Sequence, residues 1–155
     1  MGDAEYHTEL IEKPVWRLLD PDGGYKLVGG DVLTMGAYWR PGQAYEGFES
    51  CHRLEPGVYC VELEAALENI EMWCILPRHF DGKGSEVRDP SGGYFDEQHS
   101  LNIPGPHDWT RFAFTFNVPQ GAEETRILLM PQDKVYFSKV SCFRVREAAL
   151  SRIVL

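Results

Sequence analysis

WTRFAFTFNVPQGAEETRILLMPQDKVYFSKVSCFRV, residues 109–145, is the stretch that decides the fold. In its first part, apolar residues occupy every second position at Phe112, Phe114, Phe116 and Val118, and small or polar residues stand between them. Successive side chains of a strand point to opposite sides of a sheet. This period of two therefore predicts a strand that is buried on one side.

Turn residues divide the rest of the stretch into further strands. Pro119–Gly121 ends the first strand, a second apolar run covers 125–130, and a third begins at Lys134 after another proline-containing turn. Many short strands separated by Gly- and Pro-rich turns are typical of sandwiches and barrels. We therefore predict an all-β fold, an antiparallel β-sandwich.

Two groups of residues carry a resemblance to a known family. The stretch has a Trp before alternating aromatics, then V-P-x-G-A at 118–122, I-x-L at 127–129 and V-Y-F-x-x-V-S at 135–141, and residues 54–59 read L-x-P-G-x-Y. This order resembles galactose-binding-like jelly-roll domains, many of which are carbohydrate-binding modules attached to polysaccharide-degrading enzymes. The resemblance implies a jelly-roll sandwich, a glycan partner and a non-catalytic role.

The same resemblance bears on metal binding. Those modules often carry an acidic pair just before the final V-S, where an aspartate helps to hold a structural calcium. Here Ser138 and Lys139 stand at that place. We therefore expect no calcium, and the sequence indicates no other metal or cofactor.

Length and composition are those of one globular domain. The chain has 155 residues, of which 43% are hydrophobic and 25% charged. Periodicity is weak before residue 14, and a short apolar stretch, EAALSRIVL, follows the last clear strand. We expect an N-terminal tail at 1–13, the β-sandwich at 14–147 and a C-terminal segment at 148–155, which is an added edge strand, a docking segment or a linker.

Charge excludes two classes of partner. The formal net charge is −9, and 15 basic residues are scattered among 24 acidic ones. Nucleic acids and anionic membranes are bound through clustered Lys and Arg, so we expect neither as a partner. The sequence shows no signal peptide and no run long enough for a membrane span, so it assigns no compartment; a module of a secreted parent would be extracellular.

The four cysteines lack the C-x-x-C spacing of zinc and redox sites. Cys51, Cys60, Cys74 and Cys142 all lie in or beside strand-like runs, where a free cysteine is usually a small buried hydrophobe. We favour that interpretation. Cys60 and Cys74 flank a possible hairpin and are the pair to test first for a disulfide.

Two strands in the middle of the chain position a possible ligand surface. In 58–66, Tyr59 and the alternate residues after it belong to the core, which leaves Glu62 and Glu64 outward. In 70–76 the more apolar set, expected to face the core, is Ile70, Met72, Cys74 and Leu76. Trp73 is therefore expected to point outward, on the same side as Glu62 and Glu64.

Sugars stack their C–H faces on aromatic rings and hydrogen-bond through paired hydroxyls to carboxylates, amides and guanidinium groups. Loop residues 31–48 offer aromatic rings that either cap the end of the sandwich or bind a ligand. Trp109 is expected to pack locally. The alternative for the polar surface is a solvated face with Glu–Arg salt bridges. The predicted ligand-binding residues are Trp39, Tyr45, Glu62, Glu64, Trp73, Arg111, Asn117 and Arg126.

Catalytic motifs are missing from the sequence. The histidines lack H-E-x-x-H or H-x-H spacing, and no G-x-S-x-G elbow, P-loop or dinucleotide fingerprint occurs. Three functions remain open: a non-catalytic carbohydrate-binding module, which we favour, a protein-interaction or assembly sandwich within a larger complex or parent enzyme, and a carbohydrate-active enzyme.

Overall fold

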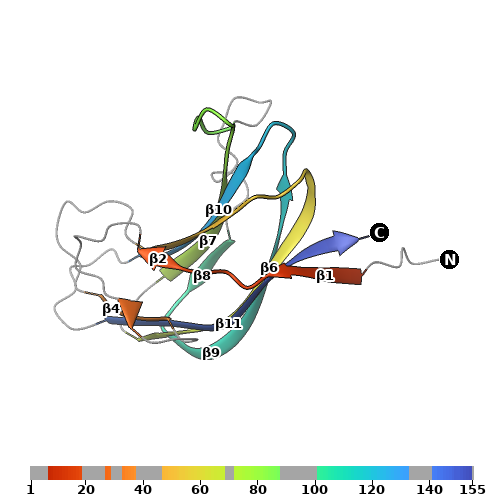
Figure 1. Ribbon diagram of the computed structural model, residues 1–155. Helices are drawn as coiled ribbons and strands as arrows, with labels where there is room; N and C mark the ends of the chain where they lie inside the picture. Colours follow the sequence, from red (N-terminus) through yellow and green to blue (C-terminus); the bar gives the residue numbers. More distant parts are fainter. Residues whose placement is uncertain are drawn as a thin grey trace.

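The computed structural model describes residues 7–18, 27–28, 33–37, 47–68, 72–87, 101–132 and 141–154, which form two antiparallel sheets packed face to face (Figure 1). Sheet A is six-stranded and has the order β3 (Leu27–Val28), β4 (Leu33–Ala37), β11 (Ser141–Val154), β6 (Gly57–Glu68) and β9 (His107–Val118), with β1 (His7–Glu12) also pairing with β11. Sheet B is five-stranded and has the order β2 (Arg17–Leu18), β5 (Phe48–His52), β10 (Glu124–Gln132), β7 (Met72–Phe80) and β8 (Leu101–Pro104). The predicted all-β sandwich is confirmed.

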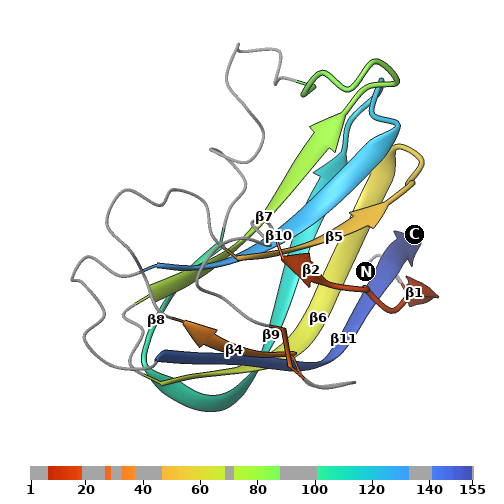
Figure 2. The same ribbon diagram turned by 60° about the vertical axis from the view of Figure 1, so that its left-hand side comes forward.

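The alternation in β9 builds one side of the core as predicted. Phe114, Phe116 and Val118 are buried, whereas the residues between them are exposed. Opposite them in β6, Tyr59 is buried and stacks on Phe116 with ring centroids 6.0 Å apart. Figure 2 shows β6, β9 and β11 as one layer and β5, β10 and β7 as the other.

The orientation predicted for the strand around Trp73 is wrong. Trp73 is fully buried, and its ring packs against Phe112 at 5.1 Å and against Phe143 at 5.2 Å between centroids. The opposite side of β7 is also apolar: Cys74 is buried on the outer side of sheet B with Leu128 and other apolar residues. Because the outer side of β7 carries more hydrophobic residues, a prediction based on hydrophobicity mistook it for the side that faces the core.

The C-terminal segment expected at 148–155 is part of the sandwich through residue 154. β11 runs from Ser141 to Val154, pairs with β6 on one side, and pairs on the other with β4 and then with β1. A bulge between Arg146 and Ala149 shifts its register, with Glu147 at a φ of 53°. Such a bulge bends a long strand and raises its twist. β11 can therefore pair with β4 along its first part and with β1 along its last part.

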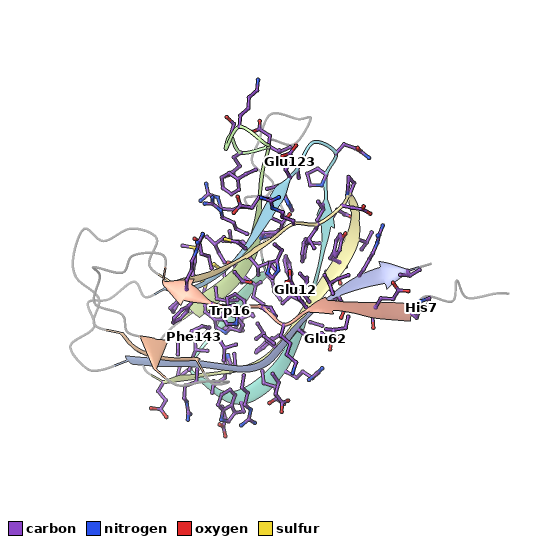
Figure 3. The ribbon with its side chains drawn as sticks, viewed as in Figure 1. His7, Glu12, Trp16, Glu62, Glu123 and Phe143 are labelled. Atoms are coloured by element: carbon purple, nitrogen blue, oxygen red, sulfur yellow. The ribbon has the colours of Figure 1, made fainter. Side chains whose placement is uncertain are left out.

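The expected N-terminal tail contains a strand. β1 pairs antiparallel with the end of β11, with Leu10 opposite Ser151, and all six of its residues are exposed. The chain then crosses to sheet B, where Arg17 pairs with Glu49. On the way Trp16 enters the core, and Figure 3 shows it between the two sheets with Phe143. The N-terminal segment therefore connects the two sheets.

Two of the cysteines are buried free thiols, as favoured, and the pair singled out for a disulfide is not bonded. Cys60 points outward from sheet A and Cys74 outward from sheet B, and both are free. Cys51 is free and exposed, which the sequence did not indicate. The side chain of Cys142 lies outside the described residues. The described part of the chain contains no helix long and apolar enough to cross a membrane.

Candidate functional site

Four of the predicted ligand-binding residues share one surface. Glu62 and Glu64 point outward from β6, and Arg111 and Asn117 point outward from the neighbouring β9. Figure 3 shows Glu62 on the outer side of sheet A. We call this surface face A; its outward side chains are Glu62, Glu64, Trp109, Arg111, Asn117, Arg144 and Arg146.

Of the other four predicted residues, the two that the structure describes do not lie on face A. Trp73 lies in the core, so it is not available to a ligand. Arg126 belongs to β10 and points outward from sheet B, on the opposite side of the sandwich. Trp39 and Tyr45 fall outside the described residues.

Ion pairs occupy face A. Arg111 contacts Glu62 at 2.6 Å and Arg146 contacts Glu64 at 2.6 Å. The arginine and glutamate of the first pair have side chains that are 58% and 40% exposed. Exposed pairs of this kind contribute at most about 1 kcal/mol to stability. Face A therefore has the salt bridges of the alternative interpretation, a solvated surface.

The aromatic ring on face A is already in contact with cations. The guanidinium carbon of Arg146 lies 3.9 Å from the ring centroid of Trp109, and that of Arg144 lies 5.2 Å from it. Cations over an indole ring are attracted by its negative face. Trp109 thus packs locally as expected, and a sugar stacking there would have to displace an arginine.

A second cluster of polar groups lies on the outer side of sheet B. We call this surface face B; it consists of Arg17, Glu49, Cys51, Arg78, Phe80, Glu124 and Arg126. These residues come from β2, β5, β10 and β7, which are far apart in sequence but adjacent in the sheet. Cross-strand pairing sets Arg17 opposite Glu49, and Arg126 opposite both Cys51 and Arg78.

Glu49 is the most buried charged group on face B. Its side chain is only 11% exposed, and its Oε1 accepts from Nε of Arg17 at 2.8 Å and contacts Nη2 of Arg17 at 2.7 Å. The same nitrogen, Nη2 of Arg17, also donates to the sulfur of Cys51 at 2.9 Å. A carboxylate that accepts from two nitrogens of one arginine is held in a fixed orientation.

Arg126 forms the centre of face B. Its guanidinium carbon lies 4.2 Å from the ring centroid of Phe80, and its Nε donates to Oε1 of Glu124 at 2.9 Å. That hydrogen bond is the main reason that the pKa of Glu124 lies below its ordinary value and the pKa of Arg126 above it. The hydrogen bond at Nε and the contact with the ring of Phe80 together orient the guanidinium.

Apolar side chains border this polar cluster. Leu128 pairs with Glu49 across the sheet and is 3% exposed, and the neighbouring Met130 is 5% exposed. The accessible part of face B is therefore the region around Arg17, Arg126 and Arg78, whose side chains are 60%, 33% and 39% exposed. Arg78 pairs there with Glu86 at 2.5 Å.

The close packing of β5 against β10 requires Gly47. A Cβ at this position would lie 2.2 Å from the carbonyl oxygen of Leu129, a distance that neither backbone could accept. Gly47 thus lets β5 begin beside β10, which places Glu49 next to Arg126.

Face B offers the chemistry that binds a neutral polyol. Carboxylates accept hydrogen bonds from hydroxyls, and a guanidinium donates in pairs. Of the charged residues on face B, Arg126 was predicted from the sequence as ligand-binding, whereas Arg17, Glu49 and Glu124 were not. Residues 49–52 contained a usable signal. Glu49 and Cys51 alternate with Ser50 and His52, so both sides of one short strand carry polar residues, which is typical of a strand with a functional or structural polar cluster.

The described residues contain no candidate metal site, since no three of their His, Cys, Asp or Glu side chains lie close enough together to hold an ion. That the chain needs no metal remains a prediction.

Comparison with known proteins gives a fold relationship. No protein-family model matches the sequence, and no curated protein sequence matches it either. Solved structures do match. A xylan-binding domain, a family 22 carbohydrate-binding module, superposes with a TM-score of 0.57 and 17% identity over 97% of this chain and 97% of that one.

Two further similar structures are parts of larger enzymes. One contains a family 22 module and the GH10 module of endo-1,4-beta-D-xylanase 10B from Clostridium thermocellum, complexed with xylohexaose (TM-score 0.60, 13% identity, 94% of this chain and 28% of that one). The other is the enzymatically active domain of tailspike protein 4 from bacteriophage CBA120 (0.58, 16%, 97% and 19%). The chain has the jelly-roll β-sandwich fold of carbohydrate-binding modules.

Proposed function

We propose that the protein is a non-catalytic carbohydrate-binding module that binds a polysaccharide or oligosaccharide on face B. The observation that carries this proposal is the set of Glu49, Arg17 and Arg126, in which a buried carboxylate and two partly exposed guanidinium groups are held in fixed orientation. The fold is compatible with it, because similar structures include modules whose own descriptions name xylan or xylohexaose.

Face B supports the proposal better than face A for an energetic reason. Binding costs less side-chain conformational entropy when the protein groups that contact the ligand are already fixed. On face B, Glu49 of β5 is held by Arg17 of β2, and Arg126 is fixed on Phe80. On face A, the pair of Arg111 and Glu62 is largely exposed to solvent, and Trp109 is covered by arginines. The predicted roles of Glu62, Glu64, Arg111 and Asn117 remain a competing hypothesis.

The charge of the chain indicates the class of glycan. With a net charge of −9 the protein repels polyanions, so neutral polysaccharides are the expected ligands. Of the aromatic residues that the sequence predicts to bind a ligand, Trp39 and Tyr45 remain candidates for stacking on a sugar, and both lie outside the described residues. A module of this kind serves a parent enzyme by holding it on its polysaccharide, and we propose a parent protein of that type as the protein partner.

The test is affinity electrophoresis of the protein through gels that contain a neutral polysaccharide. Xylan, mixed-linkage glucan, mannan and soluble cellulose derivatives form the panel, and alginate is the polyanion control. Retardation in at least one neutral gel, together with free migration in alginate, is expected. Free migration in every gel would contradict the proposal, and self-association in the same preparation would favour the assembly alternative.

A further inference from the structure

A chain of hydrogen bonds joins β1 to the interior of sheet B. Nδ1 of His52 lies 2.5 Å from Oε1 of Glu12, and Nε2 of His52 is hydrogen-bonded to the hydroxyl of Ser50. An ionised carboxylate has no proton to give, so Nδ1 donates to Glu12. Figure 3 shows Glu12 where β1 ends beside the sandwich.

The two strand residues of this chain are buried. Ser50 is 1% exposed and His52 4%, whereas the side chain of Glu12 is 47% exposed. His52 pairs across the sheet with Thr125, which is hydrogen-bonded to His79 at 3.0 Å. Buried polar groups are costly unless they are paired, and Glu12 is the one charged group that reaches His52 from outside sheet B among the described residues.

The order of groups, hydroxyl to imidazole to carboxylate, is also that of serine hydrolases. Catalysis does not follow from it here. Ser50 lies in the middle of β5, pairs with Ile127 of β10, and is closed off from solvent. A nucleophile must reach its substrate, and Ser50 cannot. We therefore assign a structural role to Ser50, His52 and Glu12.

These three residues stabilise the N-terminal segment where it crosses from sheet A to sheet B. Glu12 is the last residue of β1, and β2 begins at Arg17 after the buried Trp16. All six residues of β1 are exposed, so the strand has little apolar burial to keep it in place. β5 carries Ser50 and His52 on its inner side and Glu49, the partner of Arg17, on its outer side.

We infer that Glu12 is a positioning residue: through His52 and Ser50 it latches β1 to sheet B and so fixes β2, and with it Arg17, on face B. The latch itself is independent of the ligand, and its effect on binding rests on the proposed function. Glu12 touches no ligand in this account. It acts through the imidazole, which only a hydrogen-bond acceptor at its carboxyl position can engage.

Hydrogen–deuterium exchange of the full chain tests the latch without a ligand. In Glu12→Ala, amides of β1 and β2 should exchange faster by about tenfold or more, because a hydrogen bond to a charged group is lost. Amides of β6 and β9 should keep their rates. Glu12→Gln, whose amide oxygen still accepts from Nδ1, should restore most of the protection.

Glu9→Ala is the matched control, since Glu9 stands on the same strand, its side chain is 60% exposed, and among the described residues that side chain is paired with His7 and not with sheet B. Its exchange should equal that of the wild type. Equal exchange in Glu12→Ala and Glu9→Ala would overturn the latch, and so would a uniform acceleration that includes β6 and β9.

The ligand arm separates the two proposals. If the wild type binds a neutral glycan, Glu12→Ala should weaken binding and Glu9→Ala should not; equal affinities would overturn the link to Arg17. If the wild type binds none, the proposed function fails, and the exchange experiment alone decides the latch.

Discussion

Trp73 donates a hydrogen bond from Nε1 to Nε2 of His107 at 3.0 Å, between the two sheets. An indole N–H is a donor only, so Nε2 of His107 accepts and its Nδ1 donates to the carbonyl of Asp108 at 2.8 Å. This bond joins β7 of sheet B to β9 of sheet A. The residue that the sequence offered as a stacking platform is thus a core residue that ties the two layers together.

Replacing Trp73 should therefore affect stability. Trp73→Ala is expected to lower the free energy of unfolding by about 3–5 kcal/mol, the usual cost of truncating a large buried aromatic residue. Urea denaturation followed by circular dichroism measures the change. Phe116→Ala, which opens the same core from β9, should cost a similar amount, whereas a loss below about 1 kcal/mol in Trp73→Ala would contradict the core position.

Sequence patterns predicted those elements that have one apolar and one polar side. In β9 the residues between the phenylalanines are exposed, so the alternation specified the face. In β7 both sides carry apolar residues, with Trp73 and Ile75 inside and Cys74 outside, so hydrophobicity could not choose. The alternation in β5 could have indicated Glu49, but its grouping with Arg17 and Arg126 could not be predicted, because it depends on a sheet order that does not follow the chain.

The cysteines should differ in reactivity towards iodoacetamide in the folded protein. Cys51 is exposed but, mainly through desolvation, its pKa lies above the ordinary 9.0, so its alkylation should be slow at pH 7 and accelerate as the pH rises through 9. Burial raises the pKa of Cys74 to about 11, and this thiol should stay unmodified until the protein unfolds.

Mass spectrometry of the labelled peptides distinguishes these sites at each pH. Urea-unfolded protein, in which all thiols react, is the control for labelling efficiency. Modification of Cys74 before Cys51 under native conditions would show that the outer side of β7 is open.

The pair of Glu124 and Arg126 should make stability depend on acid pH. The hydrogen bond from Arg126 holds the pKa of Glu124 below its ordinary 4.5 in the folded protein. Such a carboxylate stabilises the fold above the unfolded-state pKa, and this contribution disappears as the pH falls through the lower folded-state pKa, here from about 5 downward.

Glu124→Gln tests this relation. The variant should be less stable than the wild type at pH 7 by about 0.2–1 kcal/mol, the range of partly exposed pairs. The difference should shrink as the pH falls and should vanish below the lowered folded-state pKa of Glu124, where both side chains are neutral. Urea melts at several pH values give the comparison, and a constant difference across them would mean that Glu124 acts only through packing.

Calcium should be dispensable for folding. Ser138 and Lys139 stand where similar modules have an acidic pair, and the described residues hold no acidic cluster suited to a metal. Removal of divalent cations with EDTA is therefore expected to leave the melting temperature unchanged in differential scanning calorimetry. A fall of more than about 10 °C that calcium reverses would reveal a site.

Binding on face B can be measured directly with two matched arginine variants. Arg126→Ala removes the guanidinium stacked on Phe80 and paired with Glu124, and Arg111→Ala removes the one paired with Glu62 on face A. Each variant breaks one partly exposed Arg–Glu pair on an outer surface. Their effects on folding should therefore be similar, and their effects on binding should differ.

Isothermal titration calorimetry of the wild type and both variants with a neutral oligosaccharide, chosen by gel retardation, is the most direct test. The wild type should bind with micromolar to millimolar affinity, Arg126→Ala should bind about tenfold or more weakly, and Arg111→Ala should match the wild type, since the loss of a charge-assisted hydrogen bond costs about 1.5–3 kcal/mol. Weakening by Arg111→Ala with none by Arg126→Ala would place the ligand on face A and contradict the account.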